Sequence, residues 1–355
     1  MRKSIKKLIP LAISVSMTPH AFANDFDLID LGSFKTDHSG MSFAQGVSAD
    51  GSIVVGYAPN NNNIDRAFKY TEAKGLEDLG TLKTDKSGRS EAKAISADGS
   101  VIVGSAVNNN NENHAFKYTD SKKMIDLGTL KTDKSGNSYA LAVSADGSVI
   151  VGQATNNNNV SHAFKYTENS QGIGTMEDLG SLRSDNTGVS VAIGVSADGS
   201  TVVGQSVYNS SGDNHAFKHT EATDMVDLGT FKSDNSGSSY AQAASANGAI
   251  VVGYAANDNG EYRAFKHADS TGLIDLGTLK TDHSGNSIAY AISADGNIIV
   301  GEADNDNGFS HAFKYTNSEG MIDLGTLKIV WAPLPIMMHL KAIMLGQQAY
   351  LVRLN

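Results

Sequence analysis

Short apolar runs separated by polar turns make up most of the chain, and residues 92–130 show the pattern well. Phe116 and Tyr118 alternate with polar neighbours, and Asp98-Gly99 separates two runs rich in Ala, Ile and Val. Alternation with a period of two predicts β-strands. Asp-Gly between two such runs predicts a hairpin with a type I′ turn, because glycine accepts positive φ. The expected strands are residues 92–97, 100–106, 114–119 and 124–130.

The same pattern recurs along nearly the whole chain. Asp-Leu-Gly occurs seven times, with spacings of 48, 48, 52, 49, 48 and 48 residues. Its copies begin at Asp30, Asp78, Asp126, Asp178, Asp227, Asp275 and Asp323. A Ser-Ala-Asp-Gly string begins at Ser48, Ser96, Ser144, Ser196 and Ser293, and Ser-Ala-Asn-Gly begins at Ser245. A third string, His/Arg-Ala-Phe-Lys, begins at Arg66, His114, His162, His215, Arg263 and His311.

Four strands in a unit of this length are typical of a β-propeller blade. We therefore expect an all-β repeat domain over residues 24–328, with six four-stranded blades. The alternative is a β-solenoid with two rungs of about 24 residues per unit. The antiparallel Asp-Gly hairpin favours the propeller, because solenoid rungs are parallel.

One copy of Asp-Leu-Gly has no matching unit. Residues 27–34 carry the seventh copy, whereas the other strings occur six times. This leaves open an incomplete seven-bladed ring, in which the N-terminal strand would join a blade that begins after Leu327. Residues 329–355 contain no Asp, Glu, Ser or Thr but hold the only Trp. That abrupt change indicates a reading-frame shift or truncation, and the alternative is a genuine apolar strand or docking tail.

The N-terminus has the pattern of a secretory signal. A basic start, a short apolar run and Ala21-Phe22-Ala23 predict a cleaved signal peptide at residues 1–23, because the run is too short to span a bilayer. Its removal changes the net charge from −10 to −14, since it contains Arg2, Lys3, Lys6 and Lys7 and no acidic residue. An acidic exported chain argues against nucleic-acid partners and against docking on anionic lipid.

Few side chains indicate chemistry. Arg66 and Arg263 occupy the slot of the repeated histidines, and arginine cannot replace a zinc ligand, so these positions are expected to donate hydrogen bonds. Calcium is the one cofactor to consider, with Asp304, Asp306 and Asp258 as candidate ligands in Asn- and Asp-rich loops. A solvated loop explains them as well. No nucleophile elbow, phosphate loop or zinc motif is present, so we expect no enzyme and no catalytic residues.

The three recurring strings are similar to those of the extracellular repeat family named for its His-Ala-Phe tripeptide (HAF repeats). The similarity covers residues 27–328. It implies a secreted bacterial protein, extracellular or on the outer-membrane surface, and in some members the passenger region of an autotransporter. Such a passenger precedes an outer-membrane barrel, which residues 329–355 do not provide.

Three functions are compatible with these features. The leading hypothesis is a secreted or cell-surface binding and adhesion module, an autotransporter passenger whose loops or rim contact an unknown glycan or protein. The second is a secreted glycan-acting propeller enzyme, which would need two carboxylates in a central pocket. The third is a truncated, non-functional passenger remnant with an unpaired sheet edge.

Overall fold

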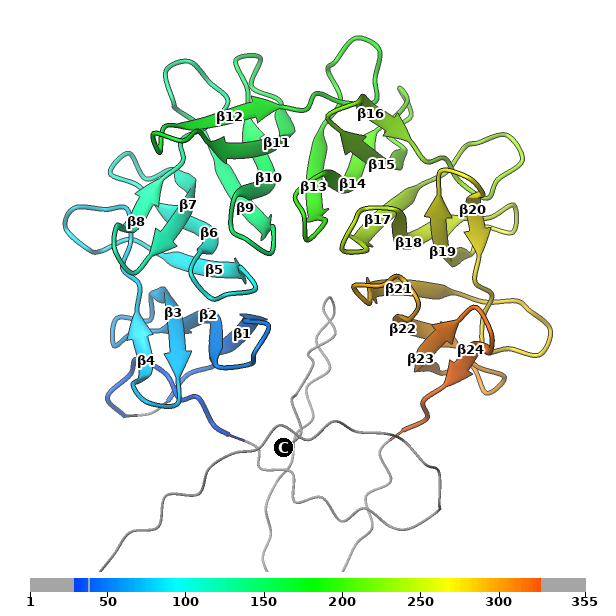
Figure 1. The fold of residues 1–355 in the computed structure, drawn as a ribbon, viewed down its shortest axis with the longest axis horizontal. Helices are drawn as coiled ribbons and strands as arrows, with labels where there is room; N and C mark the ends of the chain where they lie inside the picture. Colours follow the sequence, from blue (N-terminus) through cyan, green and yellow to red (C-terminus); the bar gives the residue numbers. More distant parts are fainter. Residues whose placement is uncertain (1–28, 38, 327–355) are drawn as a thin grey trace, which may run out of the picture. The chain divides into compact units, whose positions relative to one another are not determined.

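The computed structural model describes residues 29–37 and 39–326, and all regular structure within them is β-strand (Figure 1). No helix among these residues is long and apolar enough to cross a membrane. The expected signal peptide at residues 1–23 and the atypical tail at residues 329–355 lie outside the described residues, so both stay predictions.

The described residues form twenty-four strands, in the order expected from the repeat. The first three blades contain β1 (Phe43–Val47), β2 (Ile53–Pro59), β3 (Asp65–Thr71), β4 (Gly75–Asp78), β5 (Ser90–Ile95), β6 (Ile102–Val107), β7 (Asn113–Thr119), β8 (Lys123–Asp126), β9 (Ser138–Val143), β10 (Val149–Thr155), β11 (Ser161–Glu168) and β12 (Gly174–Asp178). The other three contain β13 (Ser190–Val195), β14 (Thr201–Val207), β15 (Asn214–Thr220), β16 (Thr223–Asp227), β17 (Ser239–Ala244), β18 (Ile250–Ala256), β19 (Tyr262–Ala268), β20 (Gly272–Asp275), β21 (Ser287–Ile292), β22 (Ile299–Asp304), β23 (Ser310–Thr316) and β24 (Gly320–Asp323).

Each unit forms one antiparallel four-stranded sheet with its strands in sequence order, so the chain is a six-bladed β-propeller. First strands of successive blades lie next to each other, as β1 does with β5 and β5 with β9. The predicted fold class is confirmed, and the solenoid alternative is wrong because its rungs would pair in parallel. The outer strands are shorter than expected, since β8 ends at Asp126 rather than near residue 130.

The hairpin turn differs in type from the one predicted. Gly99 N donates to Ser96 O over 3.0 Å, and within this turn only Gly99 has positive φ, at 75°. A type I′ turn needs positive φ at both central residues, so the observed turn is type I followed by a left-handed glycine. The side chain of Asp98 explains the difference, because its carboxylate accepts hydrogen bonds from Ser96 Oγ and from Ser100 N.

These turn carboxylates are expected to make the fold sensitive to acid. Hydrogen bonds from Ser48 and Ser52 lower the pKa of Asp50 from 3.8 to about 2. A pKa that is lower in the folded state gives stabilisation that is present above the unfolded value and is lost as pH falls through the folded value. The pKa values of Asp98, Asp146, Asp198 and Asp295 are lowered in the same way.

Asn247 fills this turn position in the fifth blade, where its side chain accepts from Ser245 Oγ and Ala249 N without a titrating group. We expect Asp98→Asn to keep the turn and to reduce the drop in Tm between pH 5 and pH 2. Thermal denaturation across that range tests this, and an unchanged acid sensitivity would contradict it.

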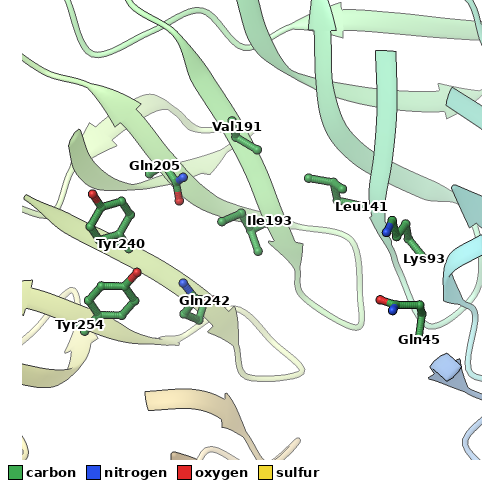
Figure 2. Close-up of a pocket in the computed structure, with 9 residues that line it drawn as sticks. All are labelled: Gln45, Lys93, Leu141, Val191, Ile193, Gln205, Tyr240, Gln242 and Tyr254. Atoms are coloured by element: carbon green, nitrogen blue, oxygen red, sulfur yellow. The ribbon is translucent and has the colours of Figure 1, made fainter. Parts of the chain in front are cut away.

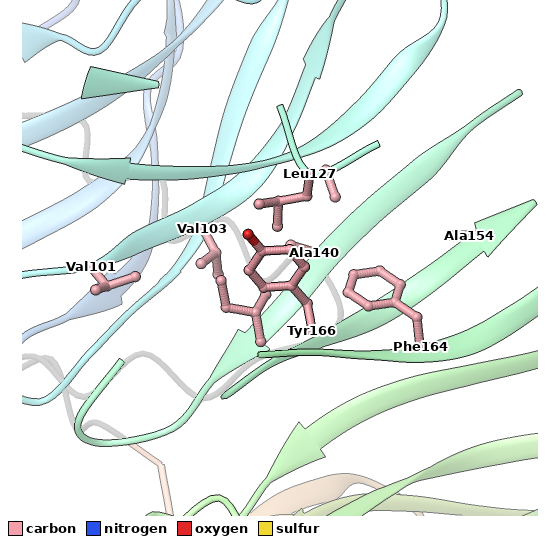
Figure 3. Packing of buried hydrophobic residues seen from close by; sticks show 9 residues of the cluster. Val101, Val103, Leu127, Ala140, Ala154, Phe164 and Tyr166 are labelled. Carbon is pink, nitrogen blue, oxygen red and sulfur yellow. The ribbon is translucent and has the colours of Figure 1, made fainter. Parts of the chain in front are cut away.

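Apolar side chains of neighbouring blades form a separate core at each seam. At the seam between the second and third blades, Val103, Ala115 and Leu127 pack against Ala140, Ile150 and Phe164 (Figure 3). Equivalent clusters fill the other four seams between consecutive blades. The repeated Val, Ala and Phe positions therefore hold blade to blade, which explains why they recur.

Hydrogen bonds reinforce the seams at the same positions. Ser90 Oγ accepts from Ala67 N of the preceding blade over 2.9 Å and donates to Gly80 O over 2.6 Å. The same serine bridge joins Ala115 to Ser138, Ala163 to Ser190, Ala216 to Ser239 and Ala264 to Ser287. Each seam is thus fixed by both apolar packing and a buried hydroxyl.

Candidate functional site

The repeated histidines and arginines pair with the Asp-Leu-Gly carboxylate of their own blade. His114 Nδ1 lies 2.8 Å from Asp126, and in the first blade Arg66 Nε lies 3.3 Å from Asp78. The carboxylate of Asp126 also accepts from Gly128 N over 2.8 Å. These residues fasten the outer strand to the third strand of each sheet, which gives them a structural use.

Of the three candidate calcium ligands, Asp258 and Asp306 lie in loops and Asp304 is the last residue of β22, and all three carboxylates accept hydrogen bonds from backbone amides. Asp258 accepts from Ser233 N over 2.9 Å, and Asp306 accepts from Thr281 N over 2.8 Å. Asp304 accepts from Asn286 N over 2.8 Å. Within residues 29–37 and 39–326, no three His, Cys, Asp or Glu residues come together as a metal site.

Some positions on the inner strands differ from blade to blade. Ser and Ala recur along each first strand, while the side chains between them change from blade to blade and are half-buried. The residue after the glycine of each second strand also changes and pairs across from them, as Tyr254 does with Tyr240. We call these positions the inner surface: Phe43, Gln45, Tyr57, Glu91, Lys93, Ser105, Tyr139, Leu141, Gln153, Val191, Ile193, Gln205, Tyr240, Gln242, Tyr254, Ile288, Tyr290 and Glu302.

A cavity of about 510 Å³ opens on the inner surface (Figure 2). Figure 2 shows Tyr240 and Tyr254 at one end, Lys93 and Gln45 at the other, and an aliphatic stretch between them. Five different blades contribute its lining: Gln45, Lys93, Leu141, Val191, Ile193, Gln205, Tyr240, Gln242 and Tyr254. Such a volume suits a small molecule or a few residues of an extended chain.

Tyrosines form the apolar end of the cavity. The rings of Tyr240 and Tyr254 stack with centroids 4.8 Å apart, and Tyr262 meets the ring of Tyr254 edge-on at 5.3 Å. Burial, together with the neighbouring tyrosines, raises the pKa of Tyr254 to about 12, so the ring stays neutral at physiological pH. The cluster is a rigid, uncharged aromatic platform with hydroxyl groups.

Charged side chains lie at the other end. Lys93 Nζ lies 2.8 Å from Glu91, which also pairs with Arg89. Lys93 Nζ additionally lies 5.4 Å from the centre of the Tyr57 ring. A second cavity of about 310 Å³ is lined by Arg89, Glu91, Lys93, Ser105, Asn113 and Tyr139. The inner surface therefore changes from aromatic to charged across the blades.

One polar atom of the cavity lining has its hydrogen-bonding capacity unused. Gln205 Oε1 is buried and has no hydrogen-bond partner among the described residues. An unsatisfied buried acceptor costs about 1–3 kcal/mol. Because Gln205 Oε1 has almost no accessible surface, a ligand could donate to it only if the side chain turned into the cavity.

Sequence reasoning missed the inner surface. Single residues that break the repeat, such as Arg183, His219 and His267, are scattered along the sequence and do not indicate it. The sequence pattern that could have shown it is three positions per blade, two on the first strand and one on the second, which vary while their neighbours recur. A strand places alternate side chains on one face, so the equivalent positions of the six blades lie on a single surface.

Comparison with known proteins bears on the fold. No family model and no curated protein matches the chain. Among solved structures, the β-propeller domain of the Trilobed protease from Pyrococcus furiosus, described as having an open velcro topology, has a TM-score of 0.50 at 11% identity, covering 80% of this chain and 81% of that one. A puromycin-hydrolyzing peptidase of Mycobacterium tuberculosis has a TM-score of 0.51 at 13% identity, covering 84% and 45%. Prolyl oligopeptidase B from Galerina marginata, bound to a 35mer substrate, has a TM-score of 0.52 at 10% identity, covering 80% and 42%.

The chain spans less than half the length of these two peptidases. The prediction of an adhesion module from an autotransporter passenger is corrected here, because the structural neighbours are propeller domains of peptidases. The resemblance to HAF repeats, the export and the absence of enzymatic activity stay predictions.

Proposed function

We propose that this propeller binds an extended polypeptide segment on its inner surface, as the peptide-handling part of a peptidase-type system, without cleaving it. The observation that carries the proposal is the cavity that joins the stacked Tyr240 and Tyr254 to the amides of Gln205 and Gln242. The likeness to peptidase propellers, one of them bound to a 35mer, supports a peptide as the ligand class.

The chemistry of the cavity fits a peptide. Tyrosine rings give large contact areas to apolar side chains and proline, and their hydroxyls add hydrogen bonds. A glutamine amide can both donate to a peptide carbonyl and accept from a peptide N–H. The amide of Gln205 could accept one such N–H if its side chain turned into the cavity, which would also satisfy its buried oxygen. A net charge of −10 disfavours a nucleic-acid strand in the same place.

Binding can be measured by fluorescence anisotropy with a labelled, unstructured twelve-residue peptide of Gly, Ser, Pro and Tyr. We expect saturable binding that Tyr254→Ala weakens by about tenfold or more, because buried tyrosines are frequent binding hot spots. Tyr208→Ala is the matched control, since Tyr208 is exposed, stacks on His215 and does not line the cavity. Circular dichroism confirms that both variants fold.

Three results would contradict this proposal. The first is no binding of the peptide by the native protein. The second is an equal loss of affinity in Tyr254→Ala and Tyr208→Ala, which would place the contact elsewhere. The third is saturable binding of xylohexaose at the same surface in preference to the peptide. Mass spectrometry of the recovered peptide tests cleavage, and no product is expected.

A further inference from the structure

Every seam within the propeller joins two complementary faces. The trailing face of a blade presents Val, Ala and Leu from its second, third and outer strands, such as Val55, Ala67 and Leu79. The leading face of the next blade presents a first-strand Ala and a second-strand Ile or Val, such as Ala92 and Ile102. The structure contains this arrangement five times, so the chemistry of each face is known.

Among residues 29–37 and 39–326, no blade packs against the trailing face of the sixth blade. Its members are Val300, Ala312 and Leu324. Leu324 is 57% exposed, whereas the five equivalent leucines are between 6% and 9% exposed. Ala312 is exposed and Val300 half-buried, although all their equivalents are 0% exposed. This apolar face is therefore more exposed than the five equivalent faces of the described blades.

The leading face of the first blade is also incompletely covered. Ala44 and Val54 are half-buried, whereas their equivalents in the other blades are no more than 2% exposed. Val54 is equivalent to Ile102, Ile150, Val202, Val251 and Ile299, and Ala44 to Ala92, Ala140, Ala192, Ala241 and Ala289. The two incomplete faces are the complementary halves of one seam type.

Residues 31–36 contact the first blade in the way that the linker between two blades contacts the following blade. Phe34 forms a parallel bridge with Asn60, as Leu279 does with Asn305 at the seam between the fifth and sixth blades. Thr36 N donates to Asn61 Oδ1 over 2.9 Å, as Thr84 N does to Asn109 Oδ1 over 3.0 Å. In the other blades this linker arrives from the outer strand of the preceding blade. Residues 31–36 therefore occupy the place of a linker from a preceding blade.

We propose that the trailing face of the sixth blade and the leading face of the first blade together bind one further unit of this same repeat, presented by a second polypeptide. Direct contact between the two faces is excluded because two segments would need the same place. The linker of the sixth blade, which begins at Leu324, would lie where residues 31–36 lie. All six Ser-Ala-Asp/Asn-Gly hairpins of residues 1–355 are built into the six sheets, so none of these six units fills the place between the two faces.

The partner is defined by the seam chemistry. Its first strand begins with a serine whose hydroxyl accepts from Ala312 N, as Ser287 accepts from Ala264 N. Alanines on that strand cover Val300 and Leu324. Its third strand carries Ala-Phe, with a trailing face that covers Ala44 and Val54. The bound unit thus makes two seams of the kind that the propeller already contains.

The probe for the first experiment is a synthetic peptide of residues 284–318, which contains the three strands β21, β22 and β23. Titrated into the full chain, it is expected to bind one to one and to raise the Tm of the protein in proportion to its occupancy. A probe with Ala289→Arg is the matched control, because Ala289 is 0% exposed in its own seam. Ala312→Arg in the full chain changes an exposed residue, so it should fold normally and lose binding by more than tenfold. Absence of binding to the native chain, or equal binding of both probes, overturns the proposal.

The second experiment uses the absence of cysteine from the sequence. The double variant Ser42→Cys/Ala312→Cys places thiols at the serine and alanine positions that meet in every seam. Under oxidation we expect no disulfide without the probe. A disulfide within one chain would show direct closure, and a disulfide between two chains would show docking of a second copy, and either result overturns the proposal. Ala67→Cys/Ser90→Cys is the positive control, since these residues meet in the structure.

Discussion

Replacing Gly152 by alanine is expected to destabilise the third blade by more than about 3 kcal/mol, because the added methyl group has no room. An ideal Cβ at Gly152 would lie 1.9 Å from Tyr139 O and 3.1 Å from Ala140 Cα. Both are backbone atoms of the paired strand, at a point where the register between β9 and β10 shifts. No rotamer change relieves the clash, so the two strands must separate. Urea unfolding of the variant measures the loss.

Gly212→Ala is the control for this substitution. Gly212 also lies in a non-helical segment, but nothing lies within 4 Å of its added Cβ, and its φ is +86°. Only the cost of placing alanine at positive φ applies there, which is about 1 kcal/mol. Equal losses in the two variants would contradict the close strand approach as the reason for glycine at position 152.

The second large effect is expected for Phe164→Ala, at about 3–5 kcal/mol. Phe164 is 0% exposed and lies in the seam cluster between the second and third blades, where Figure 3 shows its ring beside that of Tyr166. Its removal leaves a cavity that the neighbouring strands can only partly close, since each seam is fixed by its own hydrogen bonds. Thermal and urea unfolding measure the loss, and hydrogen exchange locates it.

Phe309→Ala is the matched control, because Phe309 is 66% exposed in a loop of the sixth blade. Its change is expected to stay within about 0.5 kcal/mol. If hydrogen exchange shows faster opening in all blades equally after Phe164→Ala, the seams act as one cooperative unit. A loss below 1 kcal/mol would contradict the assignment of Phe164 as a seam anchor.

The fold could be predicted from the sequence because the residue pattern within each unit indicates the strands and turns of that unit. Four strands per unit followed from alternation and Asp-Gly, and these are local signals. The type of turn could not be predicted from the sequence, because it depends on the balance between backbone strain and the hydrogen bonds that Asp98 accepts. Side-chain capping of this kind is visible only once the strand ends are fixed in space.

The pairing of His114 with Asp126 could have been predicted from the sequence. In the observed register Phe116 faces Asp126 across the third and fourth strands, which brings the histidine two residues earlier within bonding distance of the carboxylate. The seam contacts were harder to predict from the sequence, because Ala115 and Ala140 meet only when two separate sheets pack together. Predicting the inner surface would have required both the strand register within each blade and the packing between blades, because its residues come from several blades.

The division between repeated seam residues and variable inner residues makes each blade an interchangeable cassette. All seams use the same contacts, so a chain with its blades in another order would meet the same neighbours and should adopt the same fold. The order of side chains around the cavity would nevertheless change, with Tyr240 and Tyr254 moving as a pair relative to Glu91 and Lys93. Shuffled chains of this kind would offer new arrangements of one fixed set of binding groups, at little cost in stability.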